Sequence, residues 1–338
     1  MNWRLLLWPF SLIYGGITSI RNLLFNIGVL RSKSFPLPVI CIGNLSTGGT
    51  GKTPMTEYLL KNITNQKAAV VSRGYGRKTK GLILANPNST VEEIGDEPWQ
   101  IFHKFKNLKM ALAEKRVEGI DALLKAENLD FILLDDAYQH RYVKPSFSIL
   151  LSTFSQPFYQ DYILPSGNLR ESRRAVSRAD IILFTKCPND LGIEQAHIIK
   201  SKFPGKEVYF SAISYGSLKN HLGKGFKGSK KILALTGIAK PKLFIEHLAM
   251  SFEIQKHLKF PDHYQFTDKD INSFKKMLDQ NPELQIICTE KDWVRLQNHW
   301  DDSLKSKIYH LPIELEILFD EGDKFLNQIE RHLKTFKA

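Results

Sequence analysis

Residues 38–54 have the sequence PVICIGNLSTGGTGKTP, and this stretch decides the fold class. Residues 39–42 are β-prone, a glycine-rich turn follows them, and the residues after Thr53 have helical character. A strand, a glycine-rich loop and a helix in this order form the context of a P-loop, whose backbone N–H groups and helix N-terminus cradle phosphate oxygens. The sequence therefore predicts an α/β fold with a phosphate-binding turn.

The turn departs from the P-loop pattern G-x-x-x-x-G-K-[ST] at one position, because Ser46 stands where the first glycine is expected. The strand before the turn and the helix after it disfavour the alternative of a chance glycine-rich turn. Lys52 is expected to reach the β- and γ-phosphates of a nucleotide, and the Thr53 hydroxyl is expected to bind Mg²⁺. The residues predicted to surround the phosphates are Ser46, Thr47, Gly48, Gly49, Thr50, Gly51, Lys52 and Thr53.

A pair of carboxylates follows a second apolar segment, residues 131–134, which has the pattern of a buried parallel strand. Asp135 and Asp136 would lie at the carboxyl end of this strand, where ligands of parallel sheets bind. Two adjacent carboxylates there are unfavourable without a nearby cation. A charged exit from the strand is the alternative, but in combination with the P-loop the sequence predicts a Mg²⁺ site formed by Thr53, Asp135 and Asp136.

The first 56 residues contain no Asp or Glu, and sixteen uncharged residues separate Arg4 from Arg21. As a helix these sixteen residues would span ~24 Å, which is marginal against the ~30 Å core of a bilayer. Apolar residues after Pro9 follow helical spacing, which predicts a monotopic helix at an anionic membrane surface. These apolar residues are Phe10, Ile13, Tyr14, Ile17, Ile20, Leu24 and Ile27. The alternative is a core helix that covers a domain.

The composition is that of an ordinary globular protein, with 43% hydrophobic and 24% charged residues in a chain of 338, which argues against a disordered or fibrous class. The net charge of +12 indicates an anionic partner. A nucleic-acid partner is disfavoured, because the basic residues are not interleaved with stacking aromatic residues. Cys41, Cys187 and Cys288 are too few and too scattered for a zinc site, so we expect buried free thiols.

Three further polar motifs have both a functional and a structural interpretation. Asp96, in the motif GDEP, either caps a helix or points at a substrate hydroxyl. His263 follows Asp262 on a loop, in the motif FPDHY, where a structural histidine is the alternative. Residues 165–171, PSGNLRE, precede several arginines and suit an anionic ligand, unless they form a solvated face.

Apolar strands alternate with helical patterns from about residue 35 to residue 185, which predicts a mostly parallel sheet with helices on both faces. Residues 216–231 are rich in Gly and Lys and suggest a linker. The predicted organisation is a membrane-associated helix in residues 1–30, a P-loop core in residues 31–220, and a smaller α/β domain in residues 221–338.

These motifs occur together, and in this order, in a family that the chain resembles, the tetraacyldisaccharide 4′-kinases, which are the lipid A 4′-kinases of Gram-negative bacteria. Ser46 is usual in that family, whereas Ala137-Tyr138 replaces its more common Gly-Phe pair. The motifs that carry the resemblance are GNLSTGGTGKTP from Gly43, SRGYGRK from Ser72, GDEP from Gly95, LLDDAYQH from Leu133, LPSGNLRE from Leu164, FPDHY from Phe260 and TEKD from Thr289.

The resemblance implies a kinase that uses ATP and Mg²⁺ to phosphorylate the 4′-hydroxyl of a tetraacylated glucosamine disaccharide 1-phosphate, a lipid A precursor. It implies a monotopic enzyme on the cytoplasmic face of the inner membrane, in which a two-stranded link joins the P-loop core to the smaller domain. No nucleic acid and no obligatory protein partner is expected.

The resemblance also implies roles for individual residues. Asp96 would accept the proton of the sugar hydroxyl, with His263 as its dyad partner across the cleft and Asp262 orienting His263. The residues implied to line the nucleotide and catalytic pocket are Arg116, Arg170 and Glu171.

Two other functions remain open at this point. One is a soluble P-loop kinase for a small molecule, which would not need the N-terminal helix. The other is a nucleotide-dependent switch protein, because residues 289–292 have a loose similarity to a guanine-reading motif.

Overall fold

Two β-sheets organise the chain in the computed structural model, which describes residues 3–220, 225–296, 304 and 306–337. The strands of the larger sheet are β1 (Val39–Asn44), β2 (Ala68–Ser72), β3 (Ile83–Leu84), β4 (Lys109–Leu112), β5 (Phe131–Asp135), β6 (Phe147–Thr153), β7 (Ile181–Thr185), β8 (Glu207–Tyr215) and β14 (Ile313–Ile317). Their order is β14-β8-β7-β6-β1-β5-β2-β4-β3. The strands of the smaller sheet are β9 (Lys219–Asn220), β10 (Lys231–Thr236), β11 (Glu253–Lys259), β12 (Gln285–Thr289) and β13 (Ile308–Leu311), in the order β11-β10-β12-β13-β9.

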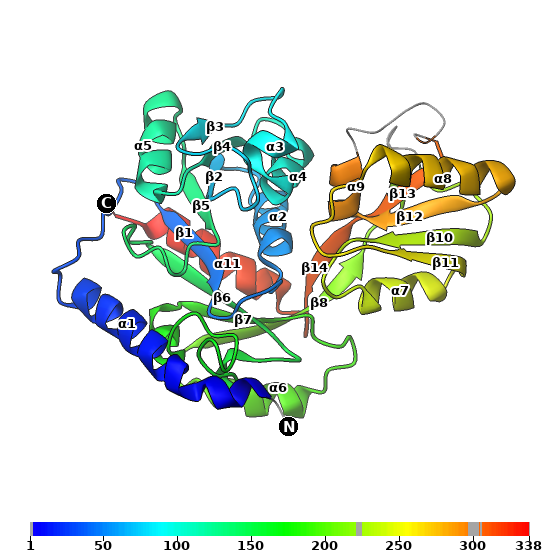
Figure 1. Cartoon of the computed structure of the whole chain (residues 1–338). Coiled ribbons are helices and arrows are strands. Elements are labelled where there is room, and N and C mark those ends of the chain that lie inside the picture. Colours follow the sequence, from blue (N-terminus) through cyan, green and yellow to red (C-terminus); the bar gives the residue numbers. More distant parts are fainter. Residues whose placement is uncertain (1–2, 221–224, 297–303, 305, 338) are drawn as a thin grey trace.

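Helices cover both sheets, and the two units stand side by side (Figure 1). The helices of the larger unit are η1 (Trp3–Leu7), α1 (Trp8–Asn26), α2 (Lys52–Asn62), α3 (Val91–Ile94), α4 (Asp96–Lys104), α5 (Arg116–Ala126), η2 (Phe158–Gln160), η3 (Arg173–Arg178), α6 (Ile193–Lys200) and α11 (Gly322–Thr335). Those of the smaller unit are α7 (Lys242–Ala249), α8 (Asp268–Gln280) and α9 (Glu290–Leu296).

The larger sheet is mostly parallel, as the apolar runs predicted. Strands β1, β2, β4, β5, β6, β7 and β8 pair in parallel, and only β3 and β14 pair antiparallel with their neighbours among the described strands. Every residue of β1, β5 and β7 is buried, because helices cover both faces of the sheet. The α/β fold class is confirmed.

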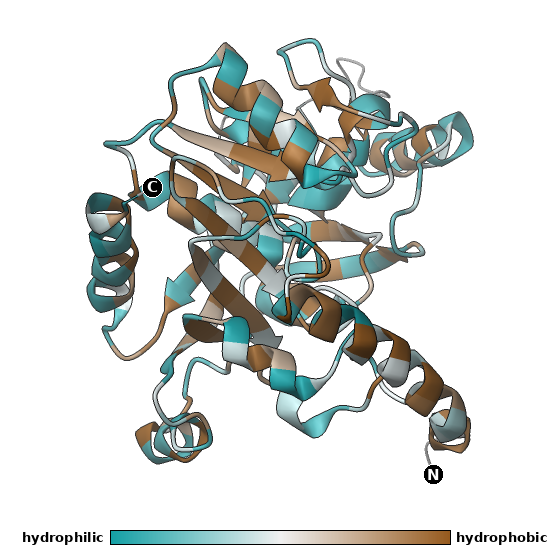
Figure 2. Cartoon of the chain, turned by 90° about the vertical axis from the view of Figure 1, so that its left-hand side faces the viewer, coloured by the Kyte–Doolittle hydropathy of each residue, from teal (hydrophilic) through white to brown (hydrophobic). Residues whose placement is uncertain are grey.

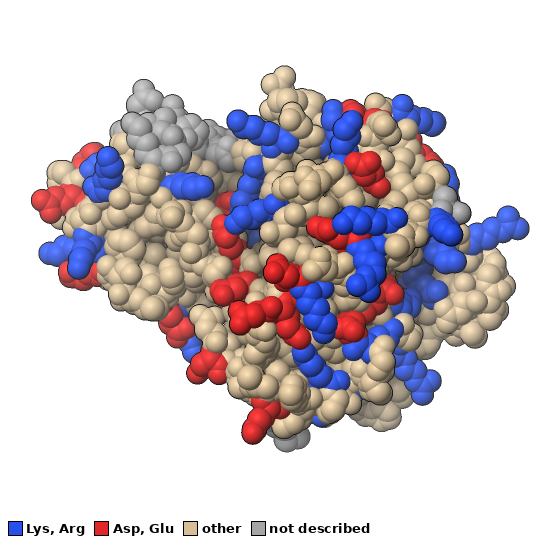
Figure 3. Space-filling view, turned by 180° about the vertical axis from the view of Figure 1, so that it is seen from behind, with Lys and Arg blue, Asp and Glu red and all other residues tan. Residues whose placement is uncertain are grey.

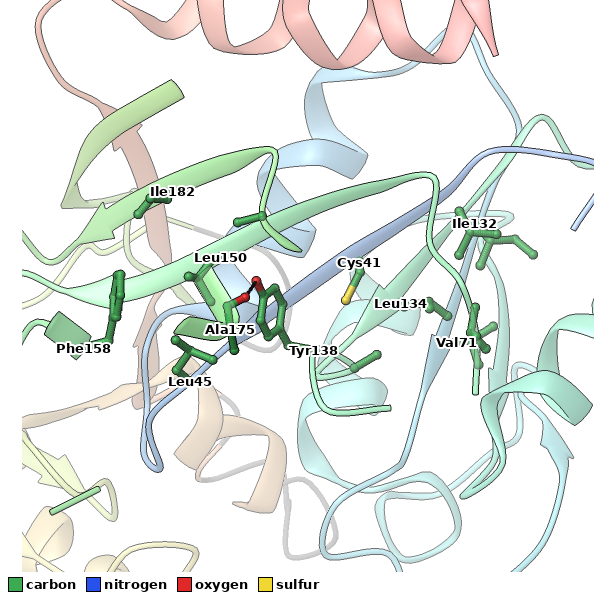
Figure 4. Packing of buried hydrophobic residues seen from close by; sticks show 14 of the residues in the cluster. Cys41, Leu45, Val71, Ile132, Leu134, Tyr138, Leu150, Phe158, Ala175 and Ile182 are labelled. Atoms are coloured by element: carbon green, nitrogen blue, oxygen red, sulfur yellow. Dashed lines mark hydrogen bonds between the residues drawn. The ribbon is translucent and has the colours of Figure 1, made fainter. Parts of the chain in front are cut away.

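One side of the larger sheet is packed by a buried apolar cluster that includes Cys41, Leu45, Leu150 and Ala175 (Figure 4). Tyr138 lies in this cluster, and its hydroxyl donates a hydrogen bond of 2.8 Å to the Ala175 carbonyl oxygen. The buried hydroxyl therefore has a partner, so a tyrosine is accommodated in the core at this position. The three cysteines are free and buried, as expected.

The predicted extent of the smaller domain, residues 221–338, is wrong at its C-terminal end. Strand β14 pairs antiparallel with β8 at the edge of the larger sheet, and α11 buries Phe325 and Ile329 in the core of the larger unit. The physical reason is that both elements have apolar residues on one side. Those of β14 and α11 pack into the core of the larger unit, next to β8 and α2. Residues 216–231 also differ from a simple linker, since β9 lies within them and pairs with β13; residues 221–224 lie outside the described residues.

Helix α1 lies along the edge of the larger unit with its polar side toward the protein. The Ser11 hydroxyl donates to the Ile163 carbonyl oxygen (3.0 Å), the Tyr14 hydroxyl donates to that of Arg170 (3.1 Å), and the Asn22 amide donates to the Glu171 carboxylate (2.7 Å). The exposed apolar residues of η1, α1 and the segment after it are Leu5, Leu6, Trp8, Phe10, Leu12, Ile13, Ile17, Ile20, Leu23, Ile27 and Val29.

Much of α1 has the colour of hydrophobic residues in Figure 2, and the exposure of these side chains shows that they face outward. The interpretation of α1 as a core helix is therefore wrong, because a core helix would turn these side chains inward. Among the residues that the structure describes, no helix has both the length and the apolar content that crossing a bilayer requires.

Candidate active site

The predicted phosphate-binding turn connects β1 to α2 at the carboxyl end of β1. Gly48 (φ 98°) and Gly51 (φ 86°) have left-handed backbones, which side chains other than glycine rarely adopt. The Asn44 side-chain amide donates to the Thr50 hydroxyl oxygen at 2.7 Å, which fixes the turn against the end of the strand. The structure thus brings the eight predicted residues, 46–53, into one turn that ends in the first residues of α2.

A second loop, residues 164–171, supports this turn. The Thr47 backbone N–H donates to the Asn168 carbonyl oxygen at 2.8 Å, and the Arg170 N–H donates to that of Leu45 at 2.7 Å. Ser46 and Leu169 form an isolated antiparallel bridge. Residues 165–171, which the sequence suggested as a separate anion-binding loop, therefore lie against the phosphate-binding turn.

Asp136 faces the cations of this site. Its Oδ1 lies 3.0 Å from the Arg170 guanidinium and 3.7 Å from Lys52 Nζ. Burial opposes ionisation of Asp136, but the attraction of Lys52 and Arg170 outweighs it and lowers the pKa of this carboxyl below its ordinary value. Asp136 is therefore ionised at neutral pH and orients Lys52 in the turn.

Asp135 has a different environment, although it is the neighbour of Asp136 in the chain. Its Oδ2 accepts a hydrogen bond of 3.1 Å from the Ser72 hydroxyl, whereas its Oδ1 is buried and has no hydrogen-bond partner among the described residues. Burial, with the repulsion of Glu97 and Asp136, raises the pKa of Asp135 to about 6. A buried carboxylate oxygen without a donor, with two other acids close enough to repel it, fits a cation ligand.

Few side chains near Asp135 could bind a metal ion. Within residues 3–220, 225–296, 304 and 306–337, no group of three or more His, Cys, Asp or Glu side chains gathers to hold a metal ion. Thr53, Asp135 and Asp136 thus supply one hydroxyl and two carboxylates. This set suits Mg²⁺, which keeps several water ligands and binds phosphate oxygens in addition to one or two carboxylates.

Asp96, the first residue of α4, is held by two residues of the smaller unit. Its Oδ2 lies 3.1 Å from His263 Nδ1, 2.6 Å from Arg295 Nη2 and 3.0 Å from Arg295 Nε. Asp96 follows Gly95, whose left-handed backbone (φ 89°) turns the chain from α3 into α4. The structure therefore joins Asp96 and His263, which are 167 residues apart in the sequence.

Arg295 is a residue of this site that the sequence analysis missed. Its side chain is fully buried, and its Nη1 donates to the Gly237 carbonyl oxygen at 2.9 Å. Asp292 lies one helical turn earlier on α9; its Oδ1 is 3.3 Å from Arg295 Nη1, and its Oδ2 accepts the Gly237 N–H at 3.0 Å. The signal for Arg295 in the sequence is its position three residues after the last member of the motif TEKD.

Asp292 is fully buried, and its Oδ2 also accepts a 2.7 Å hydrogen bond from the Thr289 hydroxyl. Both of its oxygens therefore have partners within the smaller unit. The loose similarity of residues 289–292 to a guanine-reading motif has no structural support, because a carboxylate that reads a base must be open to the ligand.

The contacts of Asp96 and His263 shift the pKa values of both. Burial favours the neutral form of Asp96, but hydrogen bonds from His263 and Arg295 outweigh this effect and lower its pKa far below the ordinary value. The hydrogen bond to Asp96 raises the pKa of His263. The ionised carboxylate of Asp96 therefore stabilises the protonated form of the His263 imidazole.

Further ion pairs join α4 to α9 around Asp96. Glu97 pairs with Lys291, and Lys104 Nζ lies 3.0 Å from Glu290 and 2.6 Å from Glu57. These pairs fix the smaller unit against the helices that flank the phosphate-binding turn. On the face of the molecule seen from behind, basic side chains lie among acidic ones rather than apart from them (Figure 3).

The remaining predicted residues lie at different distances from this centre. Asp262 Oδ1 accepts the backbone N–H of His263 at 3.1 Å but is 4.0 Å from its Nε2. Arg116 is buried and donates to the carbonyl oxygen of Ala113 at 3.1 Å.

Glu171 pairs with Arg178 at 2.7 Å and accepts the side-chain amides of Asn22 and Gln139, so its described contacts are with α1, η3 and the loop after β5 rather than with Asp96. Arg170, by contrast, lies at the phosphate-binding turn, where it contacts Asp136.

A family model described as LpxK, tetraacyldisaccharide-1-P 4′-kinase, matches residues 3–334. The chain belongs to this family. It is 44% identical to the tetraacyldisaccharide 4′-kinase of Bacteroides thetaiotaomicron, with 96% of this chain and 91% of the relative covered. It is 45% identical to that of Flavobacterium johnsoniae, with 92% of each chain covered.

The fold agrees with a crystal structure of LpxK from Aquifex aeolicus in complex with ATP, with a TM-score of 0.80 at 27% identity. The match covers 98% of this chain and 99% of that chain. The chain is thus a kinase of the tetraacyldisaccharide 4′-kinase family, and the resemblance drawn from its motifs is confirmed.

Proposed function

We propose that this kinase transfers the γ-phosphate of ATP to the 4′-hydroxyl of a tetraacyldisaccharide 1-phosphate, a precursor of lipid A. The observation that carries the proposal is the position of Asp96, an ionised carboxylate of the P-loop unit held by His263 and Arg295 of the other unit. A carboxylate so fixed between two units is suited to orient a sugar hydroxyl and to accept its proton.

The two oxygens of Asp96 have different surroundings. Oδ2 receives His263 and Arg295, whereas Oδ1 accepts only the backbone N–H of Glu97 at 3.2 Å among the described contacts. Oδ1 is therefore the oxygen that faces the substrate hydroxyl in this proposal. The low pKa of Asp96 is compatible with the role, because kinases use an aspartate as the acceptor of the hydroxyl proton.

The P-loop would neutralise the negative charge of the ATP phosphates. Its backbone N–H groups and Lys52 would bind the phosphate oxygens. Arg170 and Lys52 both contact Asp136 Oδ1, so the two cations lie on the same carboxylate. Thr53, Asp135 and Asp136 would hold Mg²⁺, which supplies positive charge next to the transferring phosphoryl group when it is bound.

Replacing Asp135 by Asn is expected to stabilise the fold at pH 7 by roughly 1–3 kcal/mol. The pKa of Asp135 is raised from 3.8 to about 6, so its ionisation destabilises the folded state progressively between these pH values and fully above them. The neutral amide would carry no such penalty. Thermal unfolding at pH 7 and pH 4 measures the effect, and the gain in stability should disappear at the lower pH.

The neighbouring residue is the matched control. Asp136→Asn should lower stability at pH 7, because the pKa of Asp136 is lowered by Lys52 and Arg170 and the ionised form is the stabilising one. If the two variants changed stability in the same direction, the assignment of Asp135 as the unpaired carboxylate would be wrong.

We further propose that α1 anchors the enzyme on the cytoplasmic face of the inner membrane. This proposal is supported by the orientation of α1. Its polar residues bind the protein, whereas its apolar residues face outward. A helix of this kind inserts its apolar face into the headgroup region, and basic residues such as Arg31 favour an anionic leaflet.

Ile13→Glu combined with Ile17→Glu is expected to reduce binding to vesicles of phosphatidylethanolamine and phosphatidylglycerol by at least about tenfold. The two side chains are 63% and 62% exposed, so the change should leave the fold intact. Co-sedimentation with the vesicles measures binding. The control is Met250→Glu, which changes an exposed apolar residue on the smaller unit. Equal binding by the double variant and wild type would exclude α1 as the anchor.

The overall proposal is tested by phosphoryl transfer in detergent. The protein is incubated with Mg-ATP and a tetraacylated glucosamine disaccharide 1-phosphate, and formation of a bis-phosphorylated lipid is measured. ATP hydrolysis that is independent of the lipid, without this product, would contradict the proposal and favour a nucleotide-dependent switch.

A further inference from the structure

Thr185 and Lys186, at the carboxyl end of β7, contact the P-loop from one side. The Thr185 hydroxyl donates to the Thr50 carbonyl oxygen at 2.9 Å, and Lys186 Nζ donates to the Gly49 carbonyl oxygen at 2.6 Å. Lys186 has a left-handed backbone (φ 57°), a strained conformation for a lysine that occurs disproportionately at functional sites. None of the motifs noticed in the sequence includes this pair.

The contact shows which side of the P-loop Lys186 occupies. In a P-loop the backbone N–H groups turn toward the phosphates, so the carbonyl oxygens of the same turn face outward. Because Lys186 Nζ binds one of these carbonyl oxygens, its side chain runs along the outer wall of the turn.

The sheet order shows which end of the nucleotide this wall meets. Strand β5, with Asp135 and Asp136, lies on one side of β1, whereas β6 and then β7 lie on the other. The γ-phosphate must lie toward the carboxylates that end β5, since those residues are the proposed metal ligands. The nucleoside end must then extend in the opposite direction, across the ends of β6 and β7.

We propose that Lys186 binds the nucleoside half of ATP, with its methylene groups against the ribose and base and its ammonium group on ribose oxygens. The inference rests on the proposed ATP-dependent function. Its ligand is distinct from that of Lys52, which serves the β- and γ-phosphates.

The charges around Lys186 agree with an anionic ligand. Burial and the repulsion of Lys240, Lys291 and Lys52 lower the pKa of Lys186 to about 8. Lys52 comes from α2, Lys291 from α9 and Lys240 from the segment before α7, so lysines of both units surround this place. The phosphates of a bound nucleotide would offset the repulsion among these ammonium groups.

The test compares ATP with inorganic tripolyphosphate, which has the phosphates but no nucleoside. In titration calorimetry of the full-length enzyme, Lys186→Met should weaken ATP binding by about tenfold, the effect of losing a charge-assisted hydrogen bond. The same variant should change tripolyphosphate binding by less than about twofold. Lys186→Arg, which keeps a donor for the Gly49 carbonyl oxygen, should recover most of the ATP affinity.

A matched control is Lys206→Met, because Lys206 also donates to backbone carbonyl oxygens, those of Ser177 and Ala179, but lies outside the site. It should leave both affinities unchanged. Equal losses for ATP and tripolyphosphate, or no loss of ATP affinity, would overturn the inference. Failure of the wild-type enzyme to bind ATP would instead count against the proposed function.

Discussion

Asp96→Asn is expected to reduce kcat for the lipid substrate by about 10²–10⁴-fold, the usual contribution of a positioned proton acceptor. The amide keeps the shape of the side chain but cannot take the proton of the sugar hydroxyl. The KM for ATP should change little, since none of the described contacts of Asp96 involves the P-loop. Steady-state kinetics with the lipid and Mg-ATP separate the two constants.

His263→Asn should cost less than Asp96→Asn, because His263 acts in this proposal through the Asp96 carboxylate. Asp121→Asn is the control, as Asp121 forms an exposed ion pair with Lys33 that contributes little. If His263→Asn proved the more damaging change, the imidazole would be the proton acceptor, and Asp96 would only orient it.

Arg295→Met is expected to destabilise the protein by about 3–5 kcal/mol, the range found when one partner of a buried ion pair is removed. Arg295 is fully buried and faces two carboxylates, Asp96 and Asp292, together with the Gly237 carbonyl oxygen. Methionine fills a similar volume but leaves both acids without their shared counter-charge. Unfolding by urea, followed by circular dichroism, measures the loss.

Lys291→Met provides the comparison on the same helix. Lys291 pairs with Glu97 but remains partly exposed, so its loss should cost at most about 1 kcal/mol. If Arg295→Met were no more damaging than Lys291→Met, the buried guanidinium would not hold the two units together in the way that its contacts indicate. Loss of Arg295 should also raise the pKa of Asp96, which a shift in the pH–rate profile would reveal.

Much of the P-loop unit could be predicted because its signals are local. Residues 38–54 contain the strand, the turn and the start of the helix, and the carboxylates at the end of β5 sit directly after an apolar run. Strand ends of a parallel sheet meet at one edge, so local patterns were sufficient to place Asp136 near Lys52.

The parts that could not be predicted depend on contacts between distant segments. Arg295 lies in an ordinary stretch of helix, and only the fold brings it to Asp96. Residues 313–317 form a strand that the sequence analysis did not single out, and nothing in their sequence indicates which of the two sheets they join. For α1, the spacing gave an amphipathic helix that suited either a membrane surface or a domain core, and only its contacts with the larger unit decided between the two orientations.

The antiparallel pair β8–β14 determines how the smaller unit is attached to the larger one. The chain leaves the larger unit after β8 and re-enters it at β14, and the Gly216 N–H donates to the Pro312 carbonyl oxygen at 3.0 Å. The smaller unit is therefore an insertion at the tip of a hairpin, a position at which proteins tolerate added domains. The P-loop lies wholly in the larger unit, whereas the inserted unit brings His263 and Arg295 to Asp96.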